Sequence, residues 1–133
     1  MRVEQDVKLT FNDVLIRPKR STLVSRSDVN LEREFSFRHS TEIWNGVPIV
    51  SANMDTTGLF SLAKVLQKHK MLTCTQKFYS TKEFCTAWEE GVNPEFIAVT
   101  CGSTESSFEL VKRKIGTNVN LQMICIDVAN GYR

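Results

Sequence analysis

Four short apolar stretches recur in the second part of the chain, and each runs into polar residues. They cover residues 47–53, 71–75, 96–100 and 121–128. Their centres lie roughly 25 residues apart, which is the period of a strand with its covering helix. Between them, apolar residues return at helical spacing, as at Leu59, Leu62, Ala63 and Leu66. The pattern predicts parallel strands joined by helices, with all strands ending at one rim.

Helix boundaries are also visible in the sequence. Ser80 and Glu83 have the capping-box spacing that begins a helix, and Gly91 is expected to end that helix. Gly116 is expected to end the next one. Because no further helical stretch follows residues 121–128, the pattern is expected to be truncated after the fourth strand.

The first third of the chain does not follow this strand–helix pattern. Residues 7–11 alternate like a short strand, and residues 31–37 alternate partly, which predicts an edge strand or a hairpin arm. Residues 17–27 are basic and rich in hydroxyl groups, and they allow two interpretations, a solvated loop or an arm that binds a phosphate. We therefore expect an N-terminal arm over residues 1–45 and the regular strand–helix part over residues 46–133.

The composition is that of a soluble globular protein, with 41% apolar and 24% charged residues. A formal net charge of +2 is too small to indicate a nucleic-acid or membrane partner. No window approaches the ~20 apolar residues that span a bilayer, and the N-terminus lacks an apolar signal region. We expect a cytoplasmic protein with no nucleic-acid partner and no membrane partner.

The four cysteines are Cys74, Cys85, Cys101 and Cys125, and they include no Cys-x-x-Cys pair. Because the chain has only two histidines, a zinc site would need an unusual set of ligands. We expect no metal site, and reduced thiols that pack in the core.

Two architectures suit four strand–helix units: a small doubly wound sheet, or part of an eight-stranded barrel. A closed barrel needs about 250 residues, roughly twice the length of this chain. The hydrophobic pattern leaves both architectures open.

Specific motifs distinguish the two. Residues 11–21, 25–27, 47–49, 52–56 and 125–132 closely resemble, in order and spacing, the N-terminal part of GMP reductase. The last two read Ala-Asn-Met-Asp-Thr and Cys-Ile-Asp-Val-Ala-Asn-Gly-Tyr. IMP dehydrogenase shares the barrel and the Met-Asp-Thr turn, but usually has a regulatory domain inserted after the helix of the second strand. The resemblance implies an α/β fold, a (β/α)8 TIM barrel of which this chain supplies an N-terminal arm and about the first four strands.

The resemblance also implies a reaction, the NADPH-dependent reductive deamination of GMP to IMP and ammonia. In that family a cysteine attacks purine C2, and the covalent adduct divides a difficult displacement into easier steps. This cysteine belongs to a Gly-Ser-x-Cys-Thr-Thr loop after the sixth strand, outside this chain. The resemblance further implies a homotetramer with a cofactor site shared between subunits, and a monovalent cation held by the absent half.

The resemblance implies site residues at seven positions. The cofactor contacts are Ser25, Arg26, Lys77, Asp127, Val128 and Ala129. The first two reach NADPH bound to a neighbouring subunit. Lys77 and Asp127 also take supporting catalytic roles, because a rim ammonium beside a carboxylate can orient a leaving amine or relay a proton. Met54 lies where the related dehydrogenases place a methionine against the purine.

Other interpretations of these residues stay open. Lys77 and Asp127 suit a structural ion pair across the rim equally well. Gln76 and Phe78 replace the histidines that usually flank the family's lysine, which puts the role of a neighbouring imidazole in doubt. Cys101 follows a strand at the rim, but its order in the chain is wrong for the nucleophile and no base lies nearby in sequence.

Two hypotheses about function follow. The chain is the N-terminal portion of a GMP reductase, or it is a naturally short, non-catalytic chain that binds nucleotide or pairs with full-length subunits through its open edges. IMP dehydrogenase is the less favoured enzyme. Both hypotheses predict little or no turnover by the isolated chain. Reading the transcript beyond Arg133 separates them: an in-frame Cys-Thr-Thr loop supports the first, and a stop codon supports the second.

Overall fold

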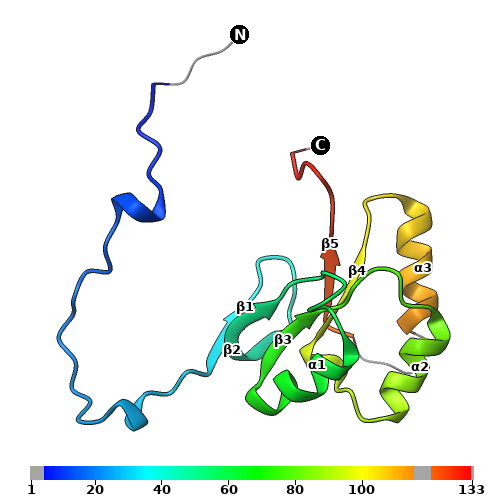
Figure 1. The fold of residues 1–133 in the computed structure, drawn as a ribbon, viewed down its shortest axis with the longest axis horizontal. Helices are drawn as coiled ribbons and strands as arrows, with labels where there is room; N and C mark the ends of the chain where they lie inside the picture. Colours follow the sequence, from blue (N-terminus) through cyan, green and yellow to red (C-terminus); the bar gives the residue numbers. More distant parts are fainter. Residues whose placement is uncertain (1–4, 116–120, 133) are drawn as a thin grey trace. The chain divides into compact units, whose positions relative to one another are not determined.

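The computed structural model describes residues 5–115 and 121–132 (Figure 1). They divide into one compact unit that ends at Asn30 and a second that begins at Leu31. The division expected between residues 45 and 46 falls inside a strand of the second unit, Ile43–Ser51.

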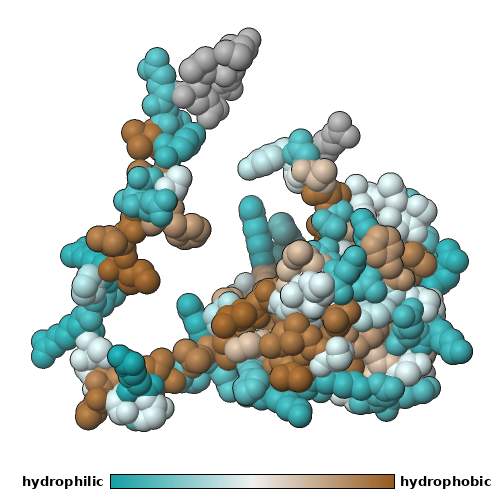
Figure 2. Space-filling model, viewed as in Figure 1, coloured by the Kyte–Doolittle hydropathy of each residue, from teal (hydrophilic) through white to brown (hydrophobic). Residues whose placement is uncertain are grey.

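The first unit contains two short 3-10 turns, η1 (Phe11–Asp13) and η2 (Arg26–Asp28). The strand predicted over residues 7–11 is wrong, because no strand is described anywhere in residues 5–30. Alternation alone does not form a strand without a partner, and here the Asp13 carboxylate accepts a hydrogen bond from the Thr10 backbone N–H at 2.8 Å and stabilises a turn. Figure 2 shows apolar side chains at the surface of this unit.

The second unit is built on a mixed sheet whose strands follow one another in sequence order. The strands are β1 (Arg33–Ser36), β2 (Ile43–Ser51), β3 (Met71–Cys74), β4 (Ile97–Cys101) and β5 (Met123–Ile126). β1 pairs antiparallel with β2, which confirms the predicted hairpin arm. The other pairings are parallel, as the strand–helix pattern predicted.

Three helices pack against one face of this sheet (Figure 1). They are α1 (Phe60–Leu66), α2 (Thr81–Glu89) and α3 (Glu105–Ile115). A doubly wound sheet reverses its strand order and carries helices on both faces. Here the order never reverses, so the unit has the arrangement of consecutive strand–helix units in a (β/α)8 barrel.

The central strand β4 shows how the two faces of the sheet differ. Ile97 and Val99 point to the helices and are almost completely buried. Ala98 points to the opposite face, where it packs with Trp44 and Leu72. That opposite face corresponds to the interior of a barrel, where side chains from neighbouring strands meet.

The predicted element boundaries are accurate to a few residues. Ser80 is the N-cap of α2, and the α2 chain leaves the helix at Gly91 with a φ of 85° that favours glycine. Phe96 belongs to a 3-10 turn, η4 (Pro94–Phe96), and not to the strand. The predicted helix end at Gly116 lies outside the described residues. The fourth predicted strand shortens to β5 because only four of its residues pair with β4.

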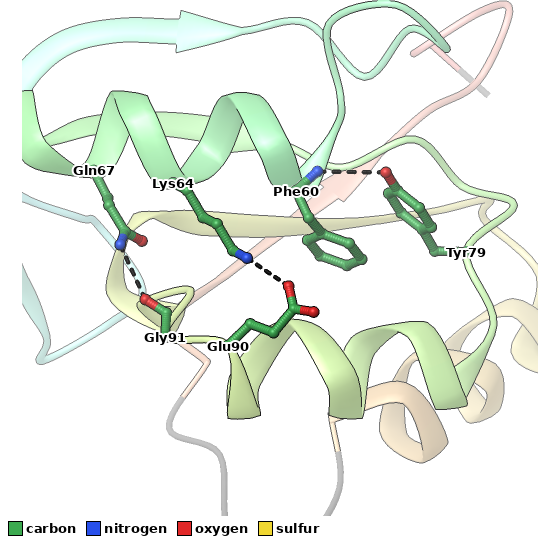
Figure 3. Close-up of polar contacts among 6 residues, drawn as sticks. All are labelled: Phe60, Lys64, Gln67, Tyr79, Glu90 and Gly91. Carbon is green, nitrogen blue, oxygen red and sulfur yellow. Dashed lines mark hydrogen bonds and ion pairs between the residues drawn. The ribbon is translucent and has the colours of Figure 1, made fainter.

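The helices α1 and α2 are joined by polar contacts as well as by packing (Figure 3). Lys64 forms an ion pair with Glu90, and Gln67 Nε2 donates a hydrogen bond to the Gly91 carbonyl at 3.0 Å. Both contacts are exposed, so they add little to the free energy of unfolding beyond fixing the helix pair. Within the described ranges, no helix is both long enough and apolar enough to cross a bilayer.

Phe84 offers a direct test of the helix-side core, because its side chain is 0% exposed and lies among the rings of Phe60, Tyr79 and Trp88. We expect Phe84→Ala to lower the free energy of unfolding by about 3–5 kcal/mol through lost burial and the cavity it leaves. Phe78→Ala is the matched control, since Phe78 is 73% exposed. Urea unfolding followed by circular dichroism measures both. Equal losses for the two variants would contradict this assignment of the core.

Candidate functional site

The loops that follow β2, β3 and β5 border one hollow at the carboxyl end of the sheet. It has a volume of about 520 Å³ and is lined by Asn53, Met54, Asp55, Thr56, Lys77, Phe78 and Asp127. Three of the predicted site residues, Met54, Lys77 and Asp127, therefore meet there although they are far apart in sequence. In a barrel this is the rim where active sites form.

A second hollow lies where β4 and β5 end. It has a volume of about 730 Å³ and is lined by Ser103, Ile126, Val128, Ala129, Asn130 and Gly131. Because Val128 directly follows Asp127 in sequence, the turn after β5 contributes to both hollows. Of the predicted cofactor contacts in the second unit, Lys77 and Asp127 line the first hollow, and Val128 and Ala129 line the second.

Ser25 and Arg26 belong to the first unit, at the start of η2. The Ser25 hydroxyl accepts a hydrogen bond from the Ser27 backbone N–H at 3.2 Å, and the Ser25 N–H donates to the Asp28 carboxylate at 2.9 Å. These bonds form a capping box that fixes the local turn. Their contact with a cofactor of a neighbouring subunit stays a prediction.

Hydrogen bonds hold the turn that carries Met54. The Met54 carbonyl accepts from the N–H groups of Thr57 and Gly58 at 3.1 and 2.7 Å. The Ser51 hydroxyl donates to the Thr57 carbonyl at 2.9 Å, and the Thr57 hydroxyl donates to the Ala52 carbonyl at 2.9 Å. The Met54 side chain itself is 61% exposed and free to pack against a ligand.

The loop between β3 and α2, which carries Lys77, is anchored along its whole length. The Gln76 N–H donates to the Gly58 carbonyl at 2.9 Å, and the Phe78 N–H donates to Gln76 Oε1 at 2.7 Å. Lys114 Nζ on α3 donates to the Lys77 carbonyl at 2.8 Å. The backbone at Lys77 is therefore held from both sides, while its side chain stays exposed at the hollow.

The same loop ends in two further contacts. The Tyr79 hydroxyl accepts a hydrogen bond from the Phe60 N–H at 3.3 Å, and the two rings stack with centroids 4.2 Å apart (Figure 3). Ser80 then caps α2, and its hydroxyl and N–H both donate to the Glu83 carboxylate. These bonds hold the pKa of Glu83 below its usual value, so that carboxylate remains charged at the helix start.

Lys77 and Asp127 are two of the three charged side chains that line the hollow, and they do not pair with each other. In the described part of the chain, no ion pair joins Lys77 to Asp127. Lys77 Nζ instead lies 5.6 Å from the centroid of the Phe78 ring. The structural ion pair that the sequence allowed is therefore not formed, and an ammonium and a carboxylate both face the hollow.

The Gln76 side chain forms a hydrogen bond with the backbone of its own loop. Its Oε1 accepts from the Phe78 N–H, and Phe78 itself is 73% exposed at the rim. The titratable groups lining this hollow are Asp55, Lys77 and Asp127. Proton transfer by side chains of this hollow would therefore depend on those three residues.

None of the four cysteines lines either hollow at the rim. Cys101 is 5% exposed, and burial followed by the neighbouring Cys125 raises the pKa of its thiol. Burial and Cys125 likewise raise the pKa of Cys74 to about 12. Protonated thiols are weak nucleophiles. Cys85 is exposed on α2, so the expectation that it packs in the core is wrong.

Lys114 is the residue that the sequence reasoning missed. It lies three positions after Val111 on the face of α3 that packs against the sheet, and both are buried. A lysine at an apolar position of a helical pattern is the signal that could have identified it.

The sequence of the chain is similar to a known protein family over nearly its whole length. Residues 8–133 match the model of the IMP dehydrogenase / GMP reductase domain. A GMP reductase of Klebsiella pneumoniae is 50% identical over 99% of this chain, and one of Escherichia coli K12 is 49% identical over the same share. In both cases the chain spans 39% of the relative's length.

A solved structure supports the fold independently. Inosine 5′-monophosphate dehydrogenase from Legionella pneumophila superimposes with a TM-score of 0.68 over 93% of this chain and 36% of its own. At 24% identity the likeness concerns the fold, and it agrees with the strand order and one-sided helices of part of a (β/α)8 barrel.

Gly58 tests whether close approach of two loops shapes the site. A Cβ at this position would lie 2.5 Å from the Gln76 backbone nitrogen and 2.8 Å from the Cys74 carbonyl oxygen. We expect Gly58→Ala to lower the free energy of unfolding by about 1–3 kcal/mol, because the loops must move apart. Gly131→Ala is the control, since a Cβ there meets nothing within 4 Å. Urea unfolding measures both, and a neutral Gly58→Ala would contradict the contact.

Proposed function

The chain belongs to the IMP dehydrogenase / GMP reductase family, and we propose that it is the N-terminal part of a GMP reductase. The proposed reaction is the NADPH-dependent reductive deamination of GMP to IMP and ammonia. One observation carries the proposal beyond family membership: Met54, Lys77 and Asp127, from three separate loops, line one hollow at the carboxyl rim. Relatives with 49–50% identity that are named GMP reductase support it.

The hollow offers groups suited to a purine nucleotide and a nicotinamide. The exposed Met54 thioether and Phe78 ring supply apolar surface for flat rings, and Lys77 and Asp127 supply a hydrogen-bond donor and an acceptor. When bound, NADPH would supply the hydride. The residues that would hold it are Lys77, Asp127, Val128 and Ala129, with Ser25 and Arg26 from a neighbouring subunit.

Lys77 has the clearest chemical role in this proposal. Release of ammonia from purine C2 requires a proton on the departing nitrogen, and an ammonium can donate it or orient that nitrogen. The fixed backbone at Lys77 lowers the entropic cost of placing its side chain. Asp127 would accept a hydrogen bond from the departing amine.

The remaining machinery is proposed to come from the part of the relatives that this chain does not span. It includes the cysteine nucleophile and any monovalent cation. In the described ranges, no group of three or more His, Cys, Asp or Glu side chains could hold a metal ion. We also propose a cytoplasmic homotetramer in which the basic arm reaches the cofactor of a neighbouring subunit.

A non-catalytic role is the second candidate, and one observation favours it. Ile124 and Ile126 of β5 are 47% and 54% exposed, and within the described sheet β5 pairs on one side only. Such an edge could pair with another chain of the same family. A stop codon directly after residue 133 would favour this role, and an in-frame continuation with a Cys-Thr-Thr loop would favour the enzyme.

Lys77→Met tests the proposed chemistry in a polypeptide that carries this chain and the remainder of the barrel. We expect GMP-dependent oxidation of NADPH to fall about 100-fold or more, because the departing nitrogen loses its proton donor. Lys68→Met, an exposed lysine in the turn after α1, is the control and should retain full activity. Nicotinamide absorbance after addition of GMP measures both. An unaltered Lys77→Met rate would refute the role of Lys77, and no GMP-dependent oxidation by the unmodified enzyme would refute the function.

The isolated 133-residue chain provides a separate test. We expect it to fold but to show no GMP-dependent oxidation of NADPH, because none of its four cysteines lines either hollow at the rim. Circular dichroism establishes folding, and the same absorbance assay measures turnover. Measurable turnover by the isolated chain would show that a nucleophile outside it is not required.

A further inference from the structure

Lys114 is an unusual residue for the inner face of a helix. Its side chain is 3% exposed, and it lies on α3 between the buried Val111 and the half-buried Ile115. Burial of an ammonium is costly unless its hydrogen bonds are satisfied. Lys114 therefore needs a hydrogen-bond acceptor inside the fold.

The partner of Lys114 is a backbone carbonyl of the candidate site. Its Nζ donates a hydrogen bond of 2.8 Å to the Lys77 carbonyl and lies 5.7 Å from the centroid of the Phe84 ring. In the part of the chain that the structure describes, no carboxylate forms an ion pair with it. The nearest acidic side chain to influence it, Glu83, is already occupied by the capping box of α2.

The surroundings of the ammonium explain why it stays in place. Burial lowers the pKa of Lys114, and the neighbouring Cys101 and Glu83 oppose that shift. The Phe84 ring adds a favourable contact between a cation and an aromatic face. A charged donor to a carbonyl forms a stronger hydrogen bond than a neutral one. The loop is thus attached to α3 by one short, partly buried contact.

We propose that Lys114 is a positioning residue, which fixes the Lys77 peptide group and thereby directs the Lys77 side chain into the rim hollow. The inference rests on the proposed function of Lys77. The carbonyl that Lys114 binds belongs to Lys77 itself, the residue whose side chain lines the hollow. Fixing this peptide group therefore acts directly on the position of the Lys77 side chain. The bonds at Gln76 and Phe78 hold the neighbouring peptide groups but leave the Lys77 carbonyl without another partner among the described contacts.

The test compares three variants in the polypeptide that carries the complete barrel. Lys114→Met keeps the length of the side chain but removes the donor, and Lys114→Arg keeps a charged donor. Lys112→Met is the control, because Lys112 lies on the same helix but pairs with the exposed Glu109. Amide hydrogen exchange of residues 76–80 reports the loop, and exchange of α3 and β4 reports the surrounding fold.

We expect Lys114→Met to speed exchange of the loop amides while those of α3 and β4 change much less. Its kcat should fall on the order of 10- to 100-fold with little change in the KM for GMP, as expected for a misplaced catalytic group. Lys114→Arg should recover at least part of both effects, and Lys112→Met should show neither.

Several outcomes would overturn the inference. Unchanged loop exchange in Lys114→Met would do so, as would an equal increase in α3, β4 and the loop, which marks a purely structural role. A loosened loop with unchanged kcat would also do so. The exchange measurement needs no turnover, so a polypeptide that fails to oxidise NADPH would refute the proposed function while the loop data still decide whether Lys114 holds Lys77.

Discussion

The site depends on backbone hydrogen bonds that continue the parallel ladder past the ends of the strands. The Thr75 N–H donates to the Ala98 carbonyl at 2.9 Å, one residue beyond β3, and the Asp127 N–H donates to the Cys101 carbonyl at 2.8 Å, one residue beyond β5. The loops therefore leave the sheet at defined points. Because all four parallel strands end on one side, these loops must meet at a common rim.

Residues that do not line the rim hollow fix the backbone of the loops that form it. Gly58 allows the loop after β2 to touch the loop after β3, and Tyr79 caps the start of α1 while it stacks on Phe60. Lys114 reaches the same loop from α3. The loop between β3 and α2 is thus contacted by the loop after β2, by α1 and by α3. A rigid backbone with exposed side chains is the arrangement that binding and catalysis require.

Most of the fold could be predicted from the sequence, because its signals are local or periodic. Apolar runs at a regular interval predicted the parallel strands, and the capping box at Ser80 predicted the start of α2. The same reasoning failed at residues 7–11, where alternation had no partner strand, and at Cys85, whose thiol is exposed on its helix. Pairing and burial depend on neighbours distant in sequence, which a local pattern does not specify. The choice of a barrel over a doubly wound sheet came from the motif resemblance, and the strand order agrees with it.

For the site, the sequence by itself determined which chemical groups follow each strand, and therefore that Asp55, Lys77 and Asp127 reach the same rim. Only the tertiary structure decided which contacts these side chains and their backbone groups make at the rim. It separated Lys77 from Asp127 and assigned the buried Lys114 to the Lys77 carbonyl. The physical reason is that periodicity reports which face of an element a residue occupies, whereas a hydrogen bond between α3 and a loop 37 residues away depends on packing in three dimensions.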